Sequence, residues 1–304
     1  MNWKGGYVST NQTDQIGLET RVVGGLVILV LLAAVFVLYV FPDSTAQSFS
    51  WTIAPRLSAV MLGAGYAAGA YFFVRVILEK QWHRVQAGFL PITAFTVCML
   101  AATVLHWGRF HQGTLPFYAW TTIYVITPFL VPYLWWRNRA SASQAIEARD
   151  LRFSSPVRWL LGAVAVAGLL VSALILAVPS SLISIAPWKL TELTARVFAG
   201  WSVLTSVTVL TLAVDARWSA TRILLESAMV GQVLMLLAMP RVWGDLNPSS
   251  PLTMLFWVSL GAALIVFAGL HLWLDRLGRS RAPATISAPP SDSARQSGPA
   301  SPAP

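Results

Sequence analysis

Eight stretches of about 20 mostly apolar residues run through this chain, and short polar segments separate them. A helix of that length crosses a hydrocarbon core about 30 Å thick. Hydrophobic residues make up 56% of the 304 residues and charged residues only 11%, whereas a soluble domain carries roughly 25% charged residues. So few charges cannot cover a water-facing surface. We therefore expect an all-α membrane protein with about eight transmembrane helices, at residues 22–41, 57–78, 88–106, 115–136, 157–178, 193–213, 219–240 and 251–274.

Basic residues concentrate in alternate segments between these stretches. The N-terminal segment, the even-numbered loops and the C-terminal segment contain Lys4, Arg21, Lys80, Arg84, Arg137, Arg139, Arg149, Arg152, Arg158, Arg217, Arg222, Arg276, Arg279 and Arg281. The odd-numbered loops contain little beyond Arg56, Arg109, Lys189 and Arg241. This asymmetry predicts a bacterial plasma-membrane protein with both termini in the cytoplasm. It also explains the net charge of +9, so we expect membrane lipid, and no nucleic acid, as a partner.

The remaining segments are polar. Residues 1–20 are expected to form a cytoplasmic N-terminal segment, residues 140–156 a cytoplasmic linker, and residues 279–304 a disordered cytoplasmic tail rich in Pro, Ser and Ala. The first apolar stretch is longer than the 7–15 residues of a signal peptide, and Asp14 and Glu19 precede it. We therefore interpret it as an uncleaved membrane anchor.

Tryptophan positions indicate an internal repeat. Five pairs have the same separation along the chain to within one position: Trp51 and Trp188, Trp82 and Trp218, Trp107 and Trp243, Trp120 and Trp257, Trp136 and Trp273. Arg21 matches Arg158 in the same way, and Leu57-Ser58-Ala59 matches Leu193-Thr194-Ala195. We predict two tandem four-helix repeats, residues 21–139 and 157–278. Four spans is an even number, so the copies are parallel, and a pseudo-twofold axis along the membrane normal relates them.

Three segments carry a resemblance to a known family. FPDSTAQSFSWTIAPRLSAVMLGAGY, LHWGRFH and APWKLTELTARVFAGW resemble an uncharacterised family of multi-pass membrane proteins from actinobacteria and related bacteria, to which no function is assigned. The likeness covers the first seven predicted helices and is most specific in the outer loops. It implies the same membrane topology and no particular reaction.

Few ionisable residues lie inside the predicted spans. Placing such a group in a membrane costs free energy, so each one is a candidate functional residue. Glu226 is the only carboxylate well inside a span. A proton-coupled carrier would use such a group, but we favour a structural hydrogen bond that Glu226 accepts from Arg75 or makes with a neighbour on its own helix. Arg75 and Arg196 lie near helix ends, where their side chains can reach the interface.

The histidines and the single cysteine give little support to a cofactor, and we expect none. His106 and His111 lie on the outer side and would bind a metal only if a loop brought them together, so we favour a polar interfacial role. Cys98 is alone, which excludes an intrachain disulfide and a cysteine metal cluster. The sequence contains no HExxH motif, nucleophile elbow or phosphate-binding glycine loop.

Opposite charges stand at matched positions of the two copies. Arg56 matches Glu192, and Arg109 matches Asp245. Because a pseudo-twofold axis places matched positions across from one another, these residues can meet near that axis. We hypothesise that Arg56 and Arg109 pair with Glu192 and Asp245, in matched or crossed fashion, and gate an outward cavity. Four separately solvated charges are the alternative.

These patterns favour a small-molecule carrier or binding protein with its site between the two repeats, open to the outside. A non-catalytic structural or accessory membrane subunit is the alternative. An enzyme is least favoured, because the sequence shows no group of residues that could act together as acid, base and nucleophile. A deep polar cavity on the axis would favour the carrier. A filled axis and an exposed small-residue face would favour the subunit. Gly65 and Gly69 have the spacing of closely packed helices, which is our default interpretation of them.

Overall fold

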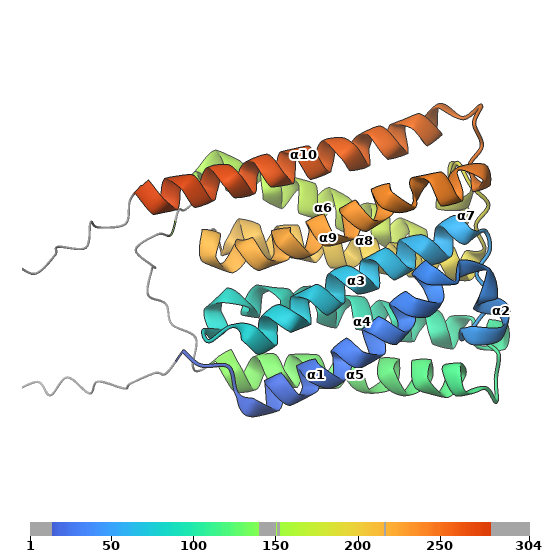
Figure 1. Ribbon diagram of the computed structural model, residues 1–304, viewed down its shortest axis with the longest axis horizontal. Coiled ribbons are helices and arrows are strands. Elements are labelled where there is room, and N and C mark those ends of the chain that lie inside the picture. Colours follow the sequence, from blue (N-terminus) through green and yellow to red (C-terminus); the bar gives the residue numbers. More distant parts are fainter. Residues whose placement is uncertain (1–13, 140–149, 151–152, 216, 281–304) are drawn as a thin grey trace, which may run out of the picture.

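The computed structural model describes residues 14–139, 150, 153–215 and 217–280, and every regular element in these residues is helical. Eight helices in them are long and apolar enough to cross a membrane, which confirms the predicted all-α class (Figure 1). They are α1 with its π-helical extension η1 (Leu18–Val35 and Phe36–Val40), α3 (Arg56–Leu78), α4 (Phe89–Leu105), α5 (Leu115–Arg139), α6 (Ser155–Ala177), α8 (Glu192–Val214), α9 (Trp218–Val242) and α10 (Pro251–Ser280).

Two helices extend further than their apolar stretches. Helix α1 begins at Leu18, within the predicted polar segment 1–20, and α10 continues to Ser280, past the predicted end of its repeat at residue 278. Polar residues can prolong a helix beyond the lipid when their side chains find partners, and Asp275 accepts a hydrogen bond from Trp218 Nε1 at 3.2 Å. Residues 1–13, 140–149 and 281–304, which include most of the predicted polar segments, lie outside the described residues.

The eight helices form two layers of four. Neighbours follow the order α10, α9, α3, α1 in one layer and α6, α8, α4, α5 in the other. Each layer therefore combines two helices from the first half of the chain with two from the second. Both ends of the described chain lie at one end of the bundle, the termini end. The short helices α2 (Thr45–Ser48) and α7 (Ser180–Ile183) lie at the opposite end of the bundle, which we call the α2–α7 end.

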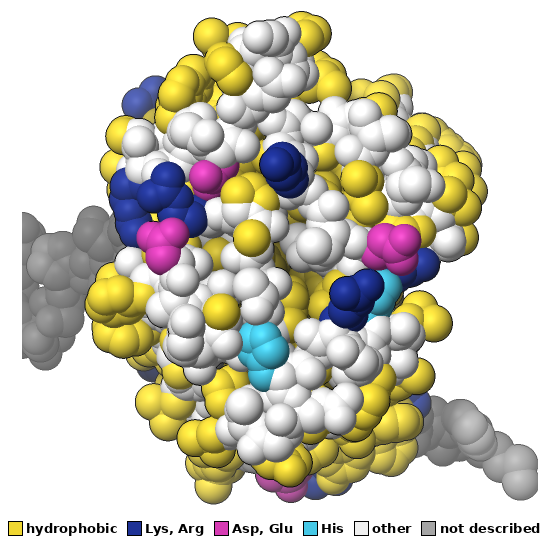
Figure 2. Space-filling model, turned by 90° about the vertical axis from the view of Figure 1, so that its right-hand side faces the viewer, with side chains coloured by type: hydrophobic (Ala, Val, Ile, Leu, Met, Phe, Trp, Pro, Cys, Tyr) yellow, Lys and Arg dark blue, Asp and Glu magenta, His cyan; other side chains and the backbone are white. Residues whose placement is uncertain are grey.

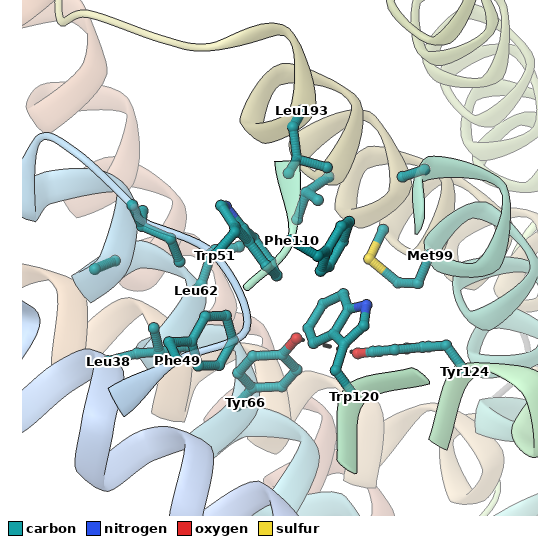
Figure 3. Packing of buried hydrophobic residues seen from close by; sticks show 14 of the residues in the cluster. Leu38, Phe49, Trp51, Leu62, Tyr66, Met99, Phe110, Trp120, Tyr124 and Leu193 are labelled. Carbon is teal, nitrogen blue, oxygen red and sulfur yellow. Dashed lines mark hydrogen bonds between the residues drawn. The ribbon is translucent and has the colours of Figure 1, made fainter. Parts of the chain in front are cut away.

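Aromatic side chains fill the space between the layers (Figure 3). Trp51 and Trp120 pack with their ring centroids 4.7 Å apart, and Trp120 packs on Tyr124 at 4.3 Å. The hydroxyls of Tyr66 and Tyr124 hydrogen-bond to each other at 3.0 Å, which satisfies two buried polar groups in an apolar core.

Gly65 of α3 lies directly against the indole of Trp201 on α8. A Cβ atom at Gly65 would lie 2.7 Å from Trp201 Cη2, closer than non-bonded carbon atoms approach. The indole cannot retreat easily, because Phe95 and Tyr66 flank it with ring centroids at 4.7 and 5.5 Å. Gly65 and Trp201 are themselves matched positions, since they have the separation that the tryptophan pairs share. The centre of the bundle is therefore filled at this level.

Several contacts recur at the spacing seen in the sequence. Arg21 donates to the carbonyls of Ile77 and Glu79 at the end of α3. Arg158 donates to the Ala213 carbonyl, at 2.8 Å, at the end of α8. Each arginine satisfies carbonyls that have no partner within their helix and lies at the negative end of the helix dipole. The matched arginines thus have the same structural role.

A second recurring contact involves two aspartates that sequence reasoning did not single out. Asp14 accepts a hydrogen bond from the His83 backbone N–H at 3.1 Å, and Asp150 accepts one from the Ser219 backbone N–H at 2.8 Å. Asp14 and Asp150 have the separation of the tryptophan pairs, and so do His83 and Ser219. A search for matched polar residues at this spacing would have found them.

The buried clusters also correspond. One cluster contains Leu193 together with Trp51, Phe110 and Trp120. Another contains Leu57 together with Leu246 and Trp257, with Trp188 packed against it. In each, a leucine at the start of α8 or α3 packs against aromatic or aliphatic residues of the other half of the chain. This exchange holds the two halves together at the α2–α7 end.

Candidate functional site

The predicted site residues do not gather in one place. Figure 2 shows the α2–α7 end, where charged side chains gather in two groups on opposite sides. One group contains Arg56 and Asp245, and the other contains His106, Glu192 and Arg196. His111 lies elsewhere at this end. Glu226 lies near the termini end, about 12 Å along α9 from its first residue, Trp218.

Asp245 binds the first turn of α3 from the other half of the chain. Its Oδ2 accepts a hydrogen bond from the Leu57 N–H at 2.8 Å, and its Oδ1 lies 3.7 Å from Arg56 Nε. Asp43 lies 3.8 Å from the same nitrogen. Pro55, at the N-cap, gives α3 no side-chain cap, so the carboxylate of Asp245 satisfies an otherwise free amide at the positive end of the helix dipole. The crossed pairing of Arg56 with Asp245 thus occurs.

The second group is built around Arg196. Its Nη1 donates to His106 Nε2 at 2.7 Å and lies 3.5 Å from Glu192 Oε2, and its Nε donates to the Leu176 carbonyl at 3.0 Å. The Arg196 side chain is only 14% exposed. It joins the ends of α4, α6 and α8.

Arg109 does not form the ion pair that the seam hypothesis required. Its guanidinium is exposed and has no carboxylate within 4 Å in the described residues, so the predicted pairing with Glu192 or Asp245 is wrong. The reason is competition, because Asp245 is already held by the N-terminus of α3, and Glu192 turns back along its own helix to Arg196.

The surroundings of His106 favour its neutral form. Burial lowers the pKa of His106 below its usual value, and the positive charges of Arg196 and Arg109 lower it further, while Glu192 acts in the opposite direction. Arginine has no acceptor atom, so Arg196 can donate to Nε2 only while that nitrogen is unprotonated. The hydrogen bond from Arg196 and the lowered pKa both favour the neutral form of His106.

This geometry predicts a pH-dependent stability. The unfolded chain takes up a proton at His106 as the pH falls through about 6.5, whereas the folded chain resists protonation until its lower pKa is reached. The free energy of unfolding should therefore decrease as the pH drops below about 6.5. Thermal unfolding of the purified protein on either side of that pH checks this. His106→Gln should lose this part of the decline, and the control His111→Gln should retain it; equal profiles for both variants would contradict the prediction.

His111 stabilises a loop. Its Nδ1 lies 3.1 Å from the Phe49 carbonyl and its Nε2 3.1 Å from Thr52 Oγ1. A carbonyl can only accept, so Nδ1 carries the proton and Nε2 is free to accept from the threonine hydroxyl. His106 and His111 thus have different partners. Within the part of the chain that the structure describes, no three His, Cys, Asp or Glu residues gather where they could hold a metal ion.

Glu226 lies at the centre of a polar cluster that joins α3, α9 and α10. Arg75 binds its Oε2, as the structural interpretation of Glu226 predicted, and the Tyr71 hydroxyl donates to the same oxygen at 2.7 Å. Arg222 Nε donates to Oε1 at 2.9 Å, and His271 Nε2 lies 3.1 Å from it. The Glu226 side chain is 12% exposed. Four partners therefore satisfy a carboxylate that would otherwise be costly in this environment.

Of these four partners, sequence reasoning missed Tyr71 and His271, whereas Arg222 is a neighbour on the helix of Glu226, as predicted. Arg75 also binds Glu79 at 2.9 Å, one helical turn further along α3, and Arg222 is one turn before Glu226 on α9. Pairs four residues apart lie on one face of a helix, so this spacing was a usable signal. His271 could not be found in this way, because it comes from α10.

Comparison of the chain with known proteins finds no matching family model, no similar curated protein and no similar solved structure. The fold itself defines the class, which is a helical, multi-pass membrane protein.

Proposed function

We propose that this chain is a small-molecule binding protein of the bacterial plasma membrane, made of two parallel four-helix repeats. Its site lies in the seam between the repeats at the α2–α7 end. The observation that carries the proposal is the pair of charged groups at this end, because each group contains residues from both halves of the chain. Charged groups that join two halves are suited to respond when a ligand enters between them.

The recurring contacts support the repeats. Arg21 and Arg158 cap equivalent helices, Asp14 and Asp150 bind equivalent backbone amides, and α3 packs on α9 as α8 packs on α4. Exchange of partners in this way is expected of a pseudo-twofold axis between the layers. Gly65 and Trp201 then lie at the axis, where matched positions meet each other.

Orientation follows from the arginine asymmetry and is tested by reporter fusions. Gly113 lies in the exposed loop between α4 and α5 at the α2–α7 end, with a φ of +81°. We expect a periplasmic reporter to be active when fused after Gly113 and inactive when fused after Arg281, because positive segments remain in the cytoplasm. A periplasmic signal from the Arg281 fusion would reverse the proposed topology.

Ligand binding is tested by thermal unfolding of the purified full-length protein. A panel of small anions, cations and neutral molecules is added to the wild type and to Arg196→Gln, at constant ionic strength. The proposal expects at least one molecule to raise the unfolding temperature of the wild type, because a ligand that binds only the folded state stabilises it. The effect should be lost in Arg196→Gln. If no molecule acts, or all act equally on the variant, the proposal fails.

A non-catalytic accessory subunit is the second candidate, and the filled bundle centre favours it. The Trp201 indole packs directly against Gly65, and Phe95 and Tyr66 flank its ring. Transport across the membrane would require these side chains to separate. Binding at the α2–α7 end does not require this, so we place binding, rather than transport, first. Co-purification with a partner protein in fixed stoichiometry, without any ligand effect, would support the subunit.

A further inference from the structure

Two helices at the edges of the bundle finish with the same short pattern at the termini end. Helix α5 contains Trp136 and, three residues later, Arg139, and α10 contains Trp273 and, three residues later, Arg276. We call each of these a Trp–Arg pair. Both pairs have the separation along the chain that the other matched tryptophans share. Because α5 and α10 lie at opposite edges of the bundle, the two pairs lie on different sides of it (Figure 1).

One polar residue inside each Trp–Arg pair turns toward the bundle and fixes the rotation of its helix. Asn138 is buried and donates to Thr20 Oγ1 at 2.7 Å. Asp275 accepts from Trp218 Nε1 at 3.2 Å. Residues three apart share a face of a helix, so the tryptophan and the arginine of each pair point outward together. The two tryptophans are 54% and 59% exposed, and both arginines are exposed.

The outward-facing arginines have no carboxylate partner. On α5, the ion pair in the described residues is made by Arg137, whose Nη2 lies 3.4 Å from Glu19 Oε1, and not by Arg139. On α10, Asp275 lies 3.8 Å from Arg222 Nη2. Within the described part of the chain, Arg276 also forms no ion pair. Each Trp–Arg pair therefore presents an exposed cation that the described chain does not neutralise.

The guanidinium of Arg139 is positioned by tryptophan rings. Its Cζ lies over Trp135 and Trp136, 5.8 and 5.9 Å from the two ring centroids. A cation–π contact of this kind holds the side chain without using its N–H donors, which remain available to an acceptor. Tryptophan prefers the boundary between the hydrocarbon and the headgroups of a membrane. The ring contacts thus place the guanidinium at the depth of the lipid phosphates.

We propose that each Trp–Arg pair binds the headgroup phosphate of one anionic phospholipid, in the leaflet at the termini end. The arginine donates to the phosphate oxygens, because guanidinium groups bind phosphate through paired, charge-assisted hydrogen bonds. The tryptophan packs against the glycerol and the upper part of the acyl chains. A zwitterionic headgroup carries its own cation, whereas an anionic headgroup supplies the missing counterion. The inference uses the membrane class of the fold and does not rest on the proposed small-molecule site at the opposite end.

Native mass spectrometry of the purified full-length protein in detergent tests the proposal by counting bound lipids. Phosphatidylglycerol is the probe. Phosphatidylcholine with the same acyl chains is the zwitterionic comparison, and glycerol 3-phosphate is the soluble anion without chains. We expect two phosphatidylglycerol molecules to be held more tightly than any further ones, with no comparable binding of the other two compounds. Arg139→Gln and Arg276→Gln should each weaken one of the two sites roughly fivefold or more, and the double variant should weaken both.

Arg137→Gln is the matched control, because it removes the same charge from the same helix end, but from an arginine that is paired with Glu19. It should keep both sites. Arg139→Lys keeps the charge and loses the planar group, so its affinity should fall between those of the wild type and Arg139→Gln. Equal losses in Arg137→Gln and Arg139→Gln would mean that binding follows net charge alone, which would overturn the two sites. Absence of two tightly held molecules, or equal binding of phosphatidylcholine, would overturn the anionic lipid, and equal binding of glycerol 3-phosphate would replace the lipid with a soluble anion.

Discussion

Glu226→Gln is expected to lower the free energy of unfolding by about 3 kcal/mol, because loss of one partner leaves a buried charge uncompensated. Among the residues that the structure describes, the surrounding cluster has three arginines and three carboxylates, namely Arg75, Arg84, Arg222, Glu79, Glu226 and Asp275. The substitution removes one negative charge from this set of described residues. The Glu226 and Arg75 side chains are only 12% and 20% exposed, so water screens this charge poorly. Titration of the purified protein with a denaturing detergent measures the loss.

Two further variants separate this explanation from a general sensitivity of α9. Arg222→Gln removes a partner whose side chain is 45% exposed, so we expect a loss below about 1 kcal/mol. The double variant Arg75→Met with Glu226→Leu removes both members of the buried pair. It should recover most of the stability lost in Glu226→Gln, since apolar replacements of a buried pair are often neutral. Wild-type stability of Glu226→Gln would contradict the role assigned to the cluster.

Gly65→Ala is expected to destabilise the protein by about 1–3 kcal/mol, the usual cost of overpacking a core. The added methyl group would lie 2.7–3.0 Å from three ring atoms of Trp201. Because Phe95 and Tyr66 flank that ring, the strain must be distributed over α3 and α8. The same unfolding titration measures the effect.

Gly69→Ala is the matched control on the same helix. The nearest atom to its new methyl group is Leu31 Cδ1 at 3.3 Å, the end of a flexible side chain. We expect no loss, or a gain of up to about 1 kcal/mol from the higher helix propensity of alanine. Combining Gly65→Ala with Trp201→Phe should restore stability, because the smaller ring leaves room. Equal effects of Gly65→Ala and Gly69→Ala would show that the contact with Trp201 is not the cause.

The fold class was predictable because it depends on local properties of the sequence. Each span is a run of apolar residues long enough to cross a membrane, and that length can be counted without knowledge of neighbouring helices. Helix ends were less predictable. Whether α10 continues to Ser280 depends on partners such as Trp218, which binds Asp275 from another helix.

The candidate site was predictable only in part. Arg75 could be proposed as a partner of Glu226 because few other charged residues lie at a comparable depth, and it does bind Glu226. The seam hypothesis correctly joined Arg56 to Asp245 and wrongly assigned a carboxylate to Arg109. Matched sequence positions indicate which residues lie near an axis, but they do not indicate which of several nearby partners a side chain will choose.

The sequence by itself determined the eight membrane-spanning helices and the nearly constant spacing between the tryptophans of the two halves, because both are properties of order along the chain. Only the tertiary structure decided that the Trp201 indole packs against Gly65 and that Asp245 binds the N-terminus of α3. It also decided that His271 reaches Glu226. These contacts join residues that are far apart in the sequence. Their formation depends on the shapes and charges of side chains from different helices, which packing brings together and which no local pattern specifies.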